Sequence, residues 1–221
     1  MTAAGAYLFL LGVASGVAVL TMTAYRRVSP AWLKWLLMAS GALVIGRYLA
    51  MALFTDPEAP TRWWGWRHCW FGSSLGLTLP GVFAVDQLVR HPALSPKTLL
   101  RWFAPFLLVY GAIIVVAPMT PSADQLGWTP RLAHGWRLIL SITHGLFVGG
   151  FLWGGMFLLN KFPFPRSTRL ALIGLMAGYG ALALDGMLRI AGGWYFRPYL
   201  FTEMAMLAAL WYAFETAAAQ Q

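Results

Sequence analysis

Long apolar stretches are the feature that most constrains how this chain folds. Each is close to the roughly 20 apolar residues that a helix needs to cross the hydrocarbon core of a bilayer. About seven such stretches occur in the 221 residues, at 4–24, 32–54, 70–89, 102–118, 137–159, 168–190 and 198–217. Because the links between them are short, we expect residues 1–221 to form a single all-α domain, a bundle of seven transmembrane helices.

The composition agrees with a membrane protein and excludes several other classes. Hydrophobic residues make up 59% of the chain and charged residues only 10%, whereas a soluble globular domain carries about a quarter charged residues. This balance argues against a disordered, collagen-like or nucleic-acid-binding protein, so we expect no nucleic acid among the partners. The lipid bilayer is the first partner that the composition predicts.

The charged residues in the links predict the orientation of the bundle. Three alternate links hold nine basic residues and no acidic one, namely Arg26, Arg27, Lys34, Arg90, Lys97, Arg101, Lys161, Arg166 and Arg169. The basic residues of the opposite links are partly offset by Asp56, Glu58 and Asp124. The positive-inside rule therefore places the N-terminus outside and the C-terminus in the cytoplasm.

Ionisable residues inside the apolar stretches point to a candidate site. Each costs free energy in hydrocarbon, so each is expected to face the bundle interior, a water-filled cavity or a partner. The six ionisable residues are Arg47, Asp86, His144, Asp185, Arg189 and Glu203. Counting along the predicted helices places five of them in the outer half of the membrane and Asp86 alone near the inner surface. We therefore predict an outward-facing polar cavity. Its expected ligand-binding residues are Arg47, His144, Trp153, Asp185, Arg189 and Glu203.

The pairing of these charges separates two interpretations of the cavity. Asp185 and Arg189 are four residues apart and share a helix face, and Arg47 has Glu203 as a candidate partner at similar depth. If the pairs only fix the register of the helices, the cavity is closed. If one guanidinium is left unpaired, a polar or anionic small molecule is the expected ligand. The sequence leaves both interpretations open.

The sequence contains no motif that identifies a cofactor or a catalytic site. A retinal protein needs a lysine in its last helix, but the three lysines all lie at the predicted inner boundary. For haem, only His144 lies clearly at membrane depth. A metal site built from His68, His134 and His144 lacks the usual ligand spacing. The cofactor therefore stays unknown, and nothing in the sequence argues for an enzyme.

Small and rigid residues predict how the helices pack. Glycines recur four residues apart, a spacing that lets helix backbones approach closely, and we expect these stripes to pack inside the bundle. The stripes are Gly12/Gly16, Gly145/Gly149, Gly150/Gly154 and Gly174/Gly178. Pro80 and Pro105 are expected to bend the third and fourth helices.

Three local features form a recognisable pattern. They are a basic first inner link at Arg26 and Arg27, the sequence from Trp70 to Ser74 ahead of Pro80, and a basic link from Arg166 to Arg169. Together with the predicted topology, it resembles the seven-helix N-terminal sensor modules of bacterial histidine kinases. The resemblance implies a ligand-responsive receptor, and we therefore expect the protein in a bacterial inner membrane. No kinase, cyclase or phosphodiesterase sequence follows the last helix in these residues, so we expect output through another membrane or cytoplasmic protein.

Three classes of function follow from these observations. The first is a stand-alone membrane sensory or ligand-binding module that signals through a partner protein. The second is a non-catalytic accessory or structural subunit of a larger membrane complex, and the third is a small transporter or channel. The outer charges separate the first two, because a receptor needs them accessible and partly unpaired whereas a subunit pairs them.

Overall fold

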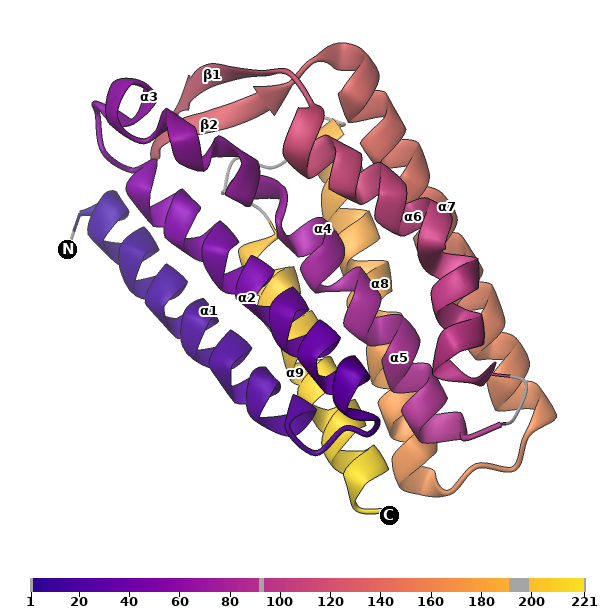
Figure 1. Ribbon diagram of the computed structural model, residues 1–221. Helices are drawn as coiled ribbons and strands as arrows, with labels where there is room; N and C mark the ends of the chain where they lie inside the picture. The colour runs from indigo at the N-terminus through magenta and orange to yellow at the C-terminus, as the bar shows by residue number, and fades with distance from the viewer. Residues whose placement is uncertain (1, 92–93, 191–198, 221) are drawn as a thin grey trace.

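The computed structural model describes residues 2–91, 94–190 and 199–220. The described chain is predominantly helical, and a two-stranded hairpin joins two of the long helices (Figure 1). In chain order the elements are α1 (Ala3–Tyr25), α2 (Ala31–Leu53), α3 (Ala59–Arg62), the 3₁₀ helix η1 (Trp64–Phe71), α4 (Ser73–Gly76), α5 (Thr78–Val89), α6 (Pro96–Val116), β1 (Met119–Asp124), β2 (Gly127–Leu132), α7 (His134–Lys161), α8 (Arg166–Ile190) and α9 (Leu200–Ala218).

Five of the described helices are long and apolar enough to cross a membrane: α1, α2, α6, α7 and α8 up to Leu188. Their outward-facing side chains are apolar as well, for example Leu108 on α6 and Leu146 on α7. Extended apolar surface of this kind is unfavourable in water and matches lipid tails. The prediction of an integral membrane protein is therefore confirmed. The predicted segments 70–89 and 198–217 correspond to η1–α4–α5 and to α9, which lie outside this set of five.

Helix α9 brings distant parts of the chain together. It packs against α8, α1 and α5, while α2 packs against α1, η1 and α4. On the other side, α7 packs mainly between α6 and α8 (Figure 1). The core between these helices is aromatic and aliphatic, with Tyr25 and Phe214 meeting edge to face at 5.0 Å between ring centroids.

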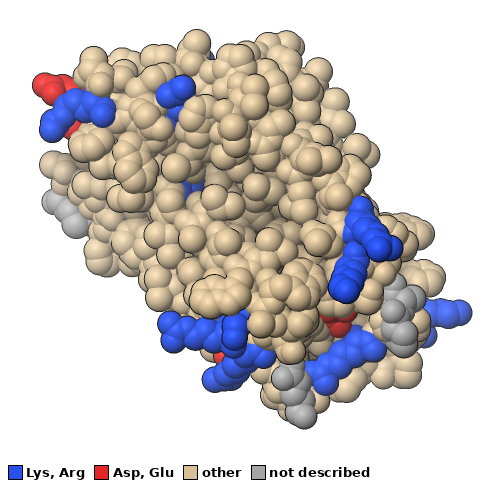
Figure 2. Space-filling model, in the orientation of Figure 1, with Lys and Arg blue, Asp and Glu red and all other residues tan. Residues whose placement is uncertain are grey.

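The two ends of the molecule differ in charge. One end, which we call the basic end, holds the C-terminal ends of α1, α5, α7 and α9 and the N-terminal ends of α2, α6 and α8 (Figure 1). The nine basic residues of the predicted inner links belong to these helix ends and loops, and Figure 2 shows Lys and Arg gathered in the lower part of the molecule. The opposite end, the hairpin end, holds β1, β2, α3 and the start of α1.

The hairpin corrects the all-helical prediction for the link that follows α6. β1 and β2 pair antiparallel from Met119 opposite Leu132 to Asp124 opposite Gly127. Gly127 has φ 122°, and a Cβ there would collide with the Phe54 carbonyl, so the turn needs glycine. Because the hairpin lies over the C-terminal end of α2, it supplies a donor for an exposed helix carbonyl: the Trp128 amide donates to Phe54 O at 2.9 Å.

The third predicted helix is broken rather than continuous. Residues 70–89 form the end of η1, α4 and α5, and the break between α4 and α5 lies at Leu77. Pro80 has no N–H and its ring crowds the carbonyl four residues earlier, that of Gly76, so a regular helix is kinked or interrupted just before Pro80. The Tyr179 hydroxyl of α8 donates to the Leu77 carbonyl, at the junction of α4 and α5, at 2.7 Å. A side chain of a neighbouring helix thus supplies a hydrogen-bond donor to the backbone beside the break, inside the bundle.

Two glycines let this broken segment lie directly on α2. A Cβ at Gly72 would collide with the Leu43 carbonyl, and one at Gly76 would meet Val44 and the Ser40 carbonyl. Gly72 and Gly76 are four residues apart, so they form a close-packing stripe of the GxxxG kind. Helix α2 is therefore the support on which the broken segment is fixed.

The predicted glycine stripes divide into two groups. On α8, Gly178 lies against Met206 of α9, so packing inside the bundle is confirmed for that stripe. A Cβ at each of the other stripe positions would meet open space, at Gly12, Gly16, Gly145, Gly149, Gly150 and Gly154. The expectation of internal packing was wrong for α1 and α7, because these helices turn their glycines outward.

Candidate functional site

The six predicted site residues lie on four helices, and the structure brings two of them together. Arg47 of α2 and Glu203 of α9 form an ion pair, with Arg47 Nε 3.1 Å from Glu203 Oε1 and 3.3 Å from Oε2. Their side chains are only 6% and 3% exposed. The two residues are 156 positions apart in sequence, so depth in the membrane was the only sequence signal that linked them.

Glu203 is placed by the first turn of α9. Its position four residues after the helix N-cap, Tyr199, puts its carboxylate near the positive end of the helix dipole. Arg47 approaches from the C-terminal half of α2, where it is one of the few buried polar side chains. A buried carboxylate thus has two favourable charges nearby, a guanidinium and a helix end.

Arg47 also holds the broken segment. Its Nη1 donates to the Trp70 carbonyl near the end of η1, and the guanidinium carbon lies 5.9 Å from the centre of the Trp70 ring. One side chain therefore connects α2, η1 and α9. Since an arginine has five donors in a fixed planar fork, it can serve a carboxylate and a carbonyl at once.

Tyr48, the next residue on α2, separates the pair from a groove on the side of the bundle. Its side chain is 1% exposed and lies close to Glu203. The same residue lines a groove of about 310 Å³ between α1 and α2, whose other lining residues include Leu11, Gly12 and Ile45. The groove is apolar, and the charged pair lies behind its wall.

His144 belongs to a different part of the bundle. It lies on α7 and its Nδ1 is 3.4 Å from the hydroxyl of Tyr110 on α6. Because α7 packs mainly on α6 and α8 while α2 packs on α1, η1 and α4, His144 and Arg47 face different neighbours. Among the described residues, no group of three or more His, Cys, Asp and Glu side chains is placed to hold a metal ion.

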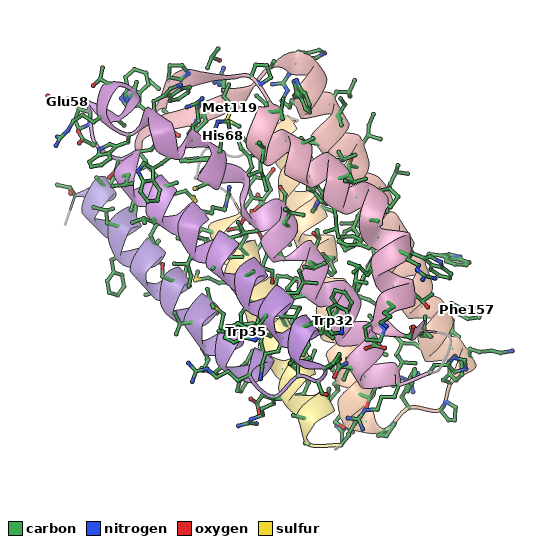
Figure 3. All side chains as sticks on the ribbon, viewed as in Figure 1. Trp32, Trp35, Glu58, His68, Met119 and Phe157 are labelled. Carbon is green, nitrogen blue, oxygen red and sulfur yellow. The ribbon has the colours of Figure 1, made fainter. Side chains whose placement is uncertain are left out.

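Trp153 does not contribute to a pocket wall. Its side chain is 74% exposed and stacks on Phe157, with 6.1 Å between ring centroids. Figure 3 shows Phe157 pointing away from the helices. The predicted cavity with Arg47, His144 and Trp153 on its walls is therefore corrected: the arginine is sealed in a pair and the tryptophan lies on the outer surface of α7.

Asp185 holds the start of α9. Its Oδ2 accepts a hydrogen bond from the Tyr199 amide at 2.7 Å and one from the Thr202 hydroxyl at 2.9 Å. A carboxylate at this position satisfies backbone donors that the first turn of a helix leaves open. The Arg189 side chain lies outside the described residues, so the predicted pair of Asp185 with Arg189 stays a prediction.

The opposite end of α9 is held by a basic residue. Arg90, in the left-handed conformation with φ 49°, donates to the Ala217 carbonyl at 2.6 Å and to the Gln220 carbonyl at 3.0 Å. A cation at a helix C-terminus satisfies its last carbonyls and its dipole. Asp86, the ionisable residue predicted to lie apart from the others, is 7% exposed and accepts from Gln87 at 2.9 Å.

The hairpin end carries a small polar cluster around Asp56. Its carboxylate accepts from the Glu58 amide at 2.9 Å, from the Trp63 indole at 3.1 Å and from Arg62 at 3.4 Å. These contacts, the Glu58 amide first, lower the pKa of Asp56 below its ordinary 3.8. The cluster is exposed and organises the α2–α3 turn.

Several important residues were missed at the sequence level. The Trp70 carbonyl accepts from Arg47, and the Tyr179 hydroxyl donates at the helix break. Both contacts are defined only by the folded chain, so no motif marks them. Gly72 and Gly76 were detectable, because they have the same spacing as the other glycine stripes. Arg90 was assigned to topology alone, although it also caps α9.

The fold and the buried charges define the class of protein: a helical integral membrane protein whose intramembrane arginine is neutralised inside the bundle. No protein-family model, curated protein or solved structure shows significant similarity to the chain. The resemblance to sensor modules therefore stays a hypothesis that depends on the sequence pattern alone.

Proposed function

We propose that the protein crosses the membrane seven times, with its N-terminus outside and its C-terminus in the cytoplasm of a bacterial cell, in the inner membrane. The five long apolar helices supply five crossings, and the broken segment 70–89 and α9 supply the other two. What supports the orientation is the concentration of nine basic residues at the basic end, opposite an end that carries Asp56, Glu58 and Asp124.

Single cysteines report on this orientation. In a Cys69→Ser background, Asp124→Cys at the hairpin end should react with a membrane-impermeant maleimide added to intact cells. Ser167→Cys at the basic end should react only after the membrane is opened. The reverse pattern contradicts the topology.

Within this topology, the protein acts as a non-catalytic subunit that packs against another membrane protein. The observation that carries this proposal is the closed state of the Arg47–Glu203 pair. A receptor for a polar ligand needs an accessible, partly unpaired charge, whereas a subunit uses such charges to fix the positions of its helices. Here the guanidinium is occupied by Glu203 and by the Trp70 carbonyl.

Helix α7 is the face that the proposal assigns to the partner, and its expected occupant is a transmembrane helix of another protein. Of its 28 residues, only Thr143, Phe147, Val148 and Gly155 are buried. Its outward glycines leave open space that a second helix backbone can approach. A helix that buries so little of itself inside its own bundle is suited to packing outside it.

Site-specific crosslinking tests the subunit proposal. A photo-reactive residue replaces Leu146 on α7, which is 66% exposed, or Phe9 on α1, which is 65% exposed and serves as the matched control. The proposal predicts that the α7 position crosslinks in high yield to one other membrane protein and that the α1 position does not. Crosslinks to lipid alone at both positions, or to a second copy of the chain, contradict it.

A second candidate function, a ligand-binding sensory module, is favoured by the groove beside Tyr48. A ligand in this groove would contact the ring that separates it from Glu203, and so would reach the pair through one side chain. Ala52→Trp at the groove should then abolish the response to ligand and leave the α7 crosslink intact. The subunit proposal predicts that filling the groove has no effect on partner binding.

A further inference from the structure

Five basic side chains form a distinct corner of the basic end. They come from the start of α6, the end of α7 and the start of α8, and they are Lys97, Arg101, Lys161, Arg166 and Arg169. All five are exposed. The two loops at this corner touch, because the rings of His91 and Phe162 are 6.0 Å apart. Lys and Arg from three helices therefore share one surface, which we call the α6–α8 corner.

The cations of this corner differ from two arginines at the same end, Arg27 and Arg90. Arg27 pairs with Glu215 at 2.6 Å, and Arg90 is engaged by the C-terminal carbonyls of α9. By contrast, the five residues of the α6–α8 corner make no ion pair or side-chain hydrogen bond within the described part of the chain. Their charge is available to a partner outside the protein.

Helix geometry adds to the positive potential there. Arg166 is the first residue of α8, and Lys97 is the second residue of α6, which begins after the N-cap Ser95. The N-terminal end of a helix is itself positive, so cations there are unfavourable unless an anion is near. A bound anion would satisfy the helix ends and the side chains together.

Exposed aromatic residues place this surface at the edge of the bilayer. Trp102, next to Arg101, is 71% exposed, and Phe157, one turn before Lys161, is 52% exposed. Tryptophan beside Lys or Arg is typical of a protein surface at the depth of the lipid headgroups. There the ring contacts acyl chains and the cation contacts phosphate. The corner thus has the chemistry of a headgroup contact.

We propose that the α6–α8 corner is a binding site for the headgroups of anionic phospholipids. Charge complementarity carries the proposal. Five cations that form no ion pair with the described residues, together with two helix N-termini, face a leaflet that supplies phosphate. Arginine binds phosphate oxygens through paired N–H donors, and zwitterionic lipids offer the same phosphate with a cation attached. The site therefore selects lipids with a net negative charge.

Lipid titration of the purified full-length chain tests this site. The protein in non-ionic detergent is titrated with phosphatidylglycerol or with phosphatidylcholine of the same acyl chains, and native mass spectrometry counts the lipids retained. The variant is Arg166→Gln/Arg169→Gln, and the charge-matched control is Arg131→Gln/Arg137→Gln near the hairpin end. Arg166→Lys/Arg169→Lys keeps the charge and checks that any loss is electrostatic.

The proposal predicts that phosphatidylglycerol binds more tightly than phosphatidylcholine and that 0.5 M salt weakens this preference. The Gln variant should lose about fivefold in phosphatidylglycerol affinity for each charge removed, while the hairpin-end control and the Lys variant should stay near the original value. Equal binding of the two lipids, or an equal loss in the hairpin-end control, overturns it. Inorganic phosphate that competes as well as the lipid would also overturn it, because the site would then bind free anions. The salt and lipid comparisons use the unaltered protein, so they decide the matter even if a variant fails to fold.

Discussion

Arg47 and Glu203 meet at 3.1 Å across the contact between α2 and α9, and their side chains are 6% and 3% exposed. Removing two charges from water costs free energy that their attraction only partly offsets, so such a pair is weak evidence of added stability. Its effect is on arrangement: the same guanidinium binds the Trp70 carbonyl, so α2, α9 and the broken segment have one relative position that satisfies all three groups.

Tyr179→Phe tests how the helix break is tolerated. The hydroxyl donates to the Leu77 carbonyl inside the bundle, and its loss leaves that carbonyl without its side-chain donor. We expect the free energy of unfolding to fall by about 1 kcal/mol, measured by denaturant titration in detergent with far-UV circular dichroism. Tyr212→Phe, at a tyrosine that is 39% exposed, is the control and should change little. Equal effects at the two positions would show that the break does not depend on Tyr179.

Glycine substitutions distinguish the close contact on α2 from the open face of α7. Gly76→Ala introduces a methyl group against Val44 and the Ser40 carbonyl, so we expect a loss of about 1–3 kcal/mol in unfolding free energy. Gly145→Ala meets open space and should leave the purified protein unchanged or slightly more stable. Both are measured by thermal unfolding in the same detergent. If Gly76→Ala is as stable as Gly145→Ala, the contact between α4 and α2 is looser than described.

His68, in η1 near the hairpin end, gives a pH dependence with a defined sign. Burial first, and then the charge of Arg67, lower the pKa of His68 below its ordinary 6.5. Between the folded-state pKa and 6.5, His68 therefore binds a proton in the unfolded chain but not in the folded chain. His68 favours folding above pH 6.5, and this contribution is lost as the pH falls through the folded-state pKa.

Unfolding midpoints between about pH 7.5 and 5 check this expectation. His68→Gln removes the titrating group, so the variant should lose less stability on acidification than the unaltered chain. A variant with the same pH slope would mean that His68 does not contribute to the acid sensitivity of the fold.

Much of the helical framework could be predicted because apolar length is a local property. The positions of α1, α2, α6, α7 and α8 follow from runs of apolar residues, and the partnership of Arg47 with Glu203 was named as a candidate from their similar depth. Helix breaks are harder to predict, since Pro80 permits either a bend or a full interruption. At the interruption, the Leu77 carbonyl accepts from Tyr179, which is 102 residues away in sequence, and no local pattern reveals such a partner.

The direction in which α7 faces could not be predicted for a physical reason. From Gly145 to Leu159, α7 consists only of apolar residues and glycine, so hydrophobic periodicity there does not distinguish a bundle face from a lipid face. Trp153 was therefore assigned to a cavity wall although it lies outside. The hairpin was missed because the link between α6 and α7 has little alternation of polar and apolar residues, and its main support is the contact of Gly127 and Trp128 with the end of α2.

The central claim is that Arg47 and Glu203 satisfy each other inside the bundle, and a double-mutant cycle tests it most directly. The free energy of unfolding is measured for the unaltered chain, Arg47→Met, Glu203→Leu and the double variant. Each single change should cost about 3–5 kcal/mol, because it leaves a buried charge without its partner, and the double variant should recover most of that loss. Single changes that cost less than about 1 kcal/mol, or losses that simply add in the double variant, would contradict the claim.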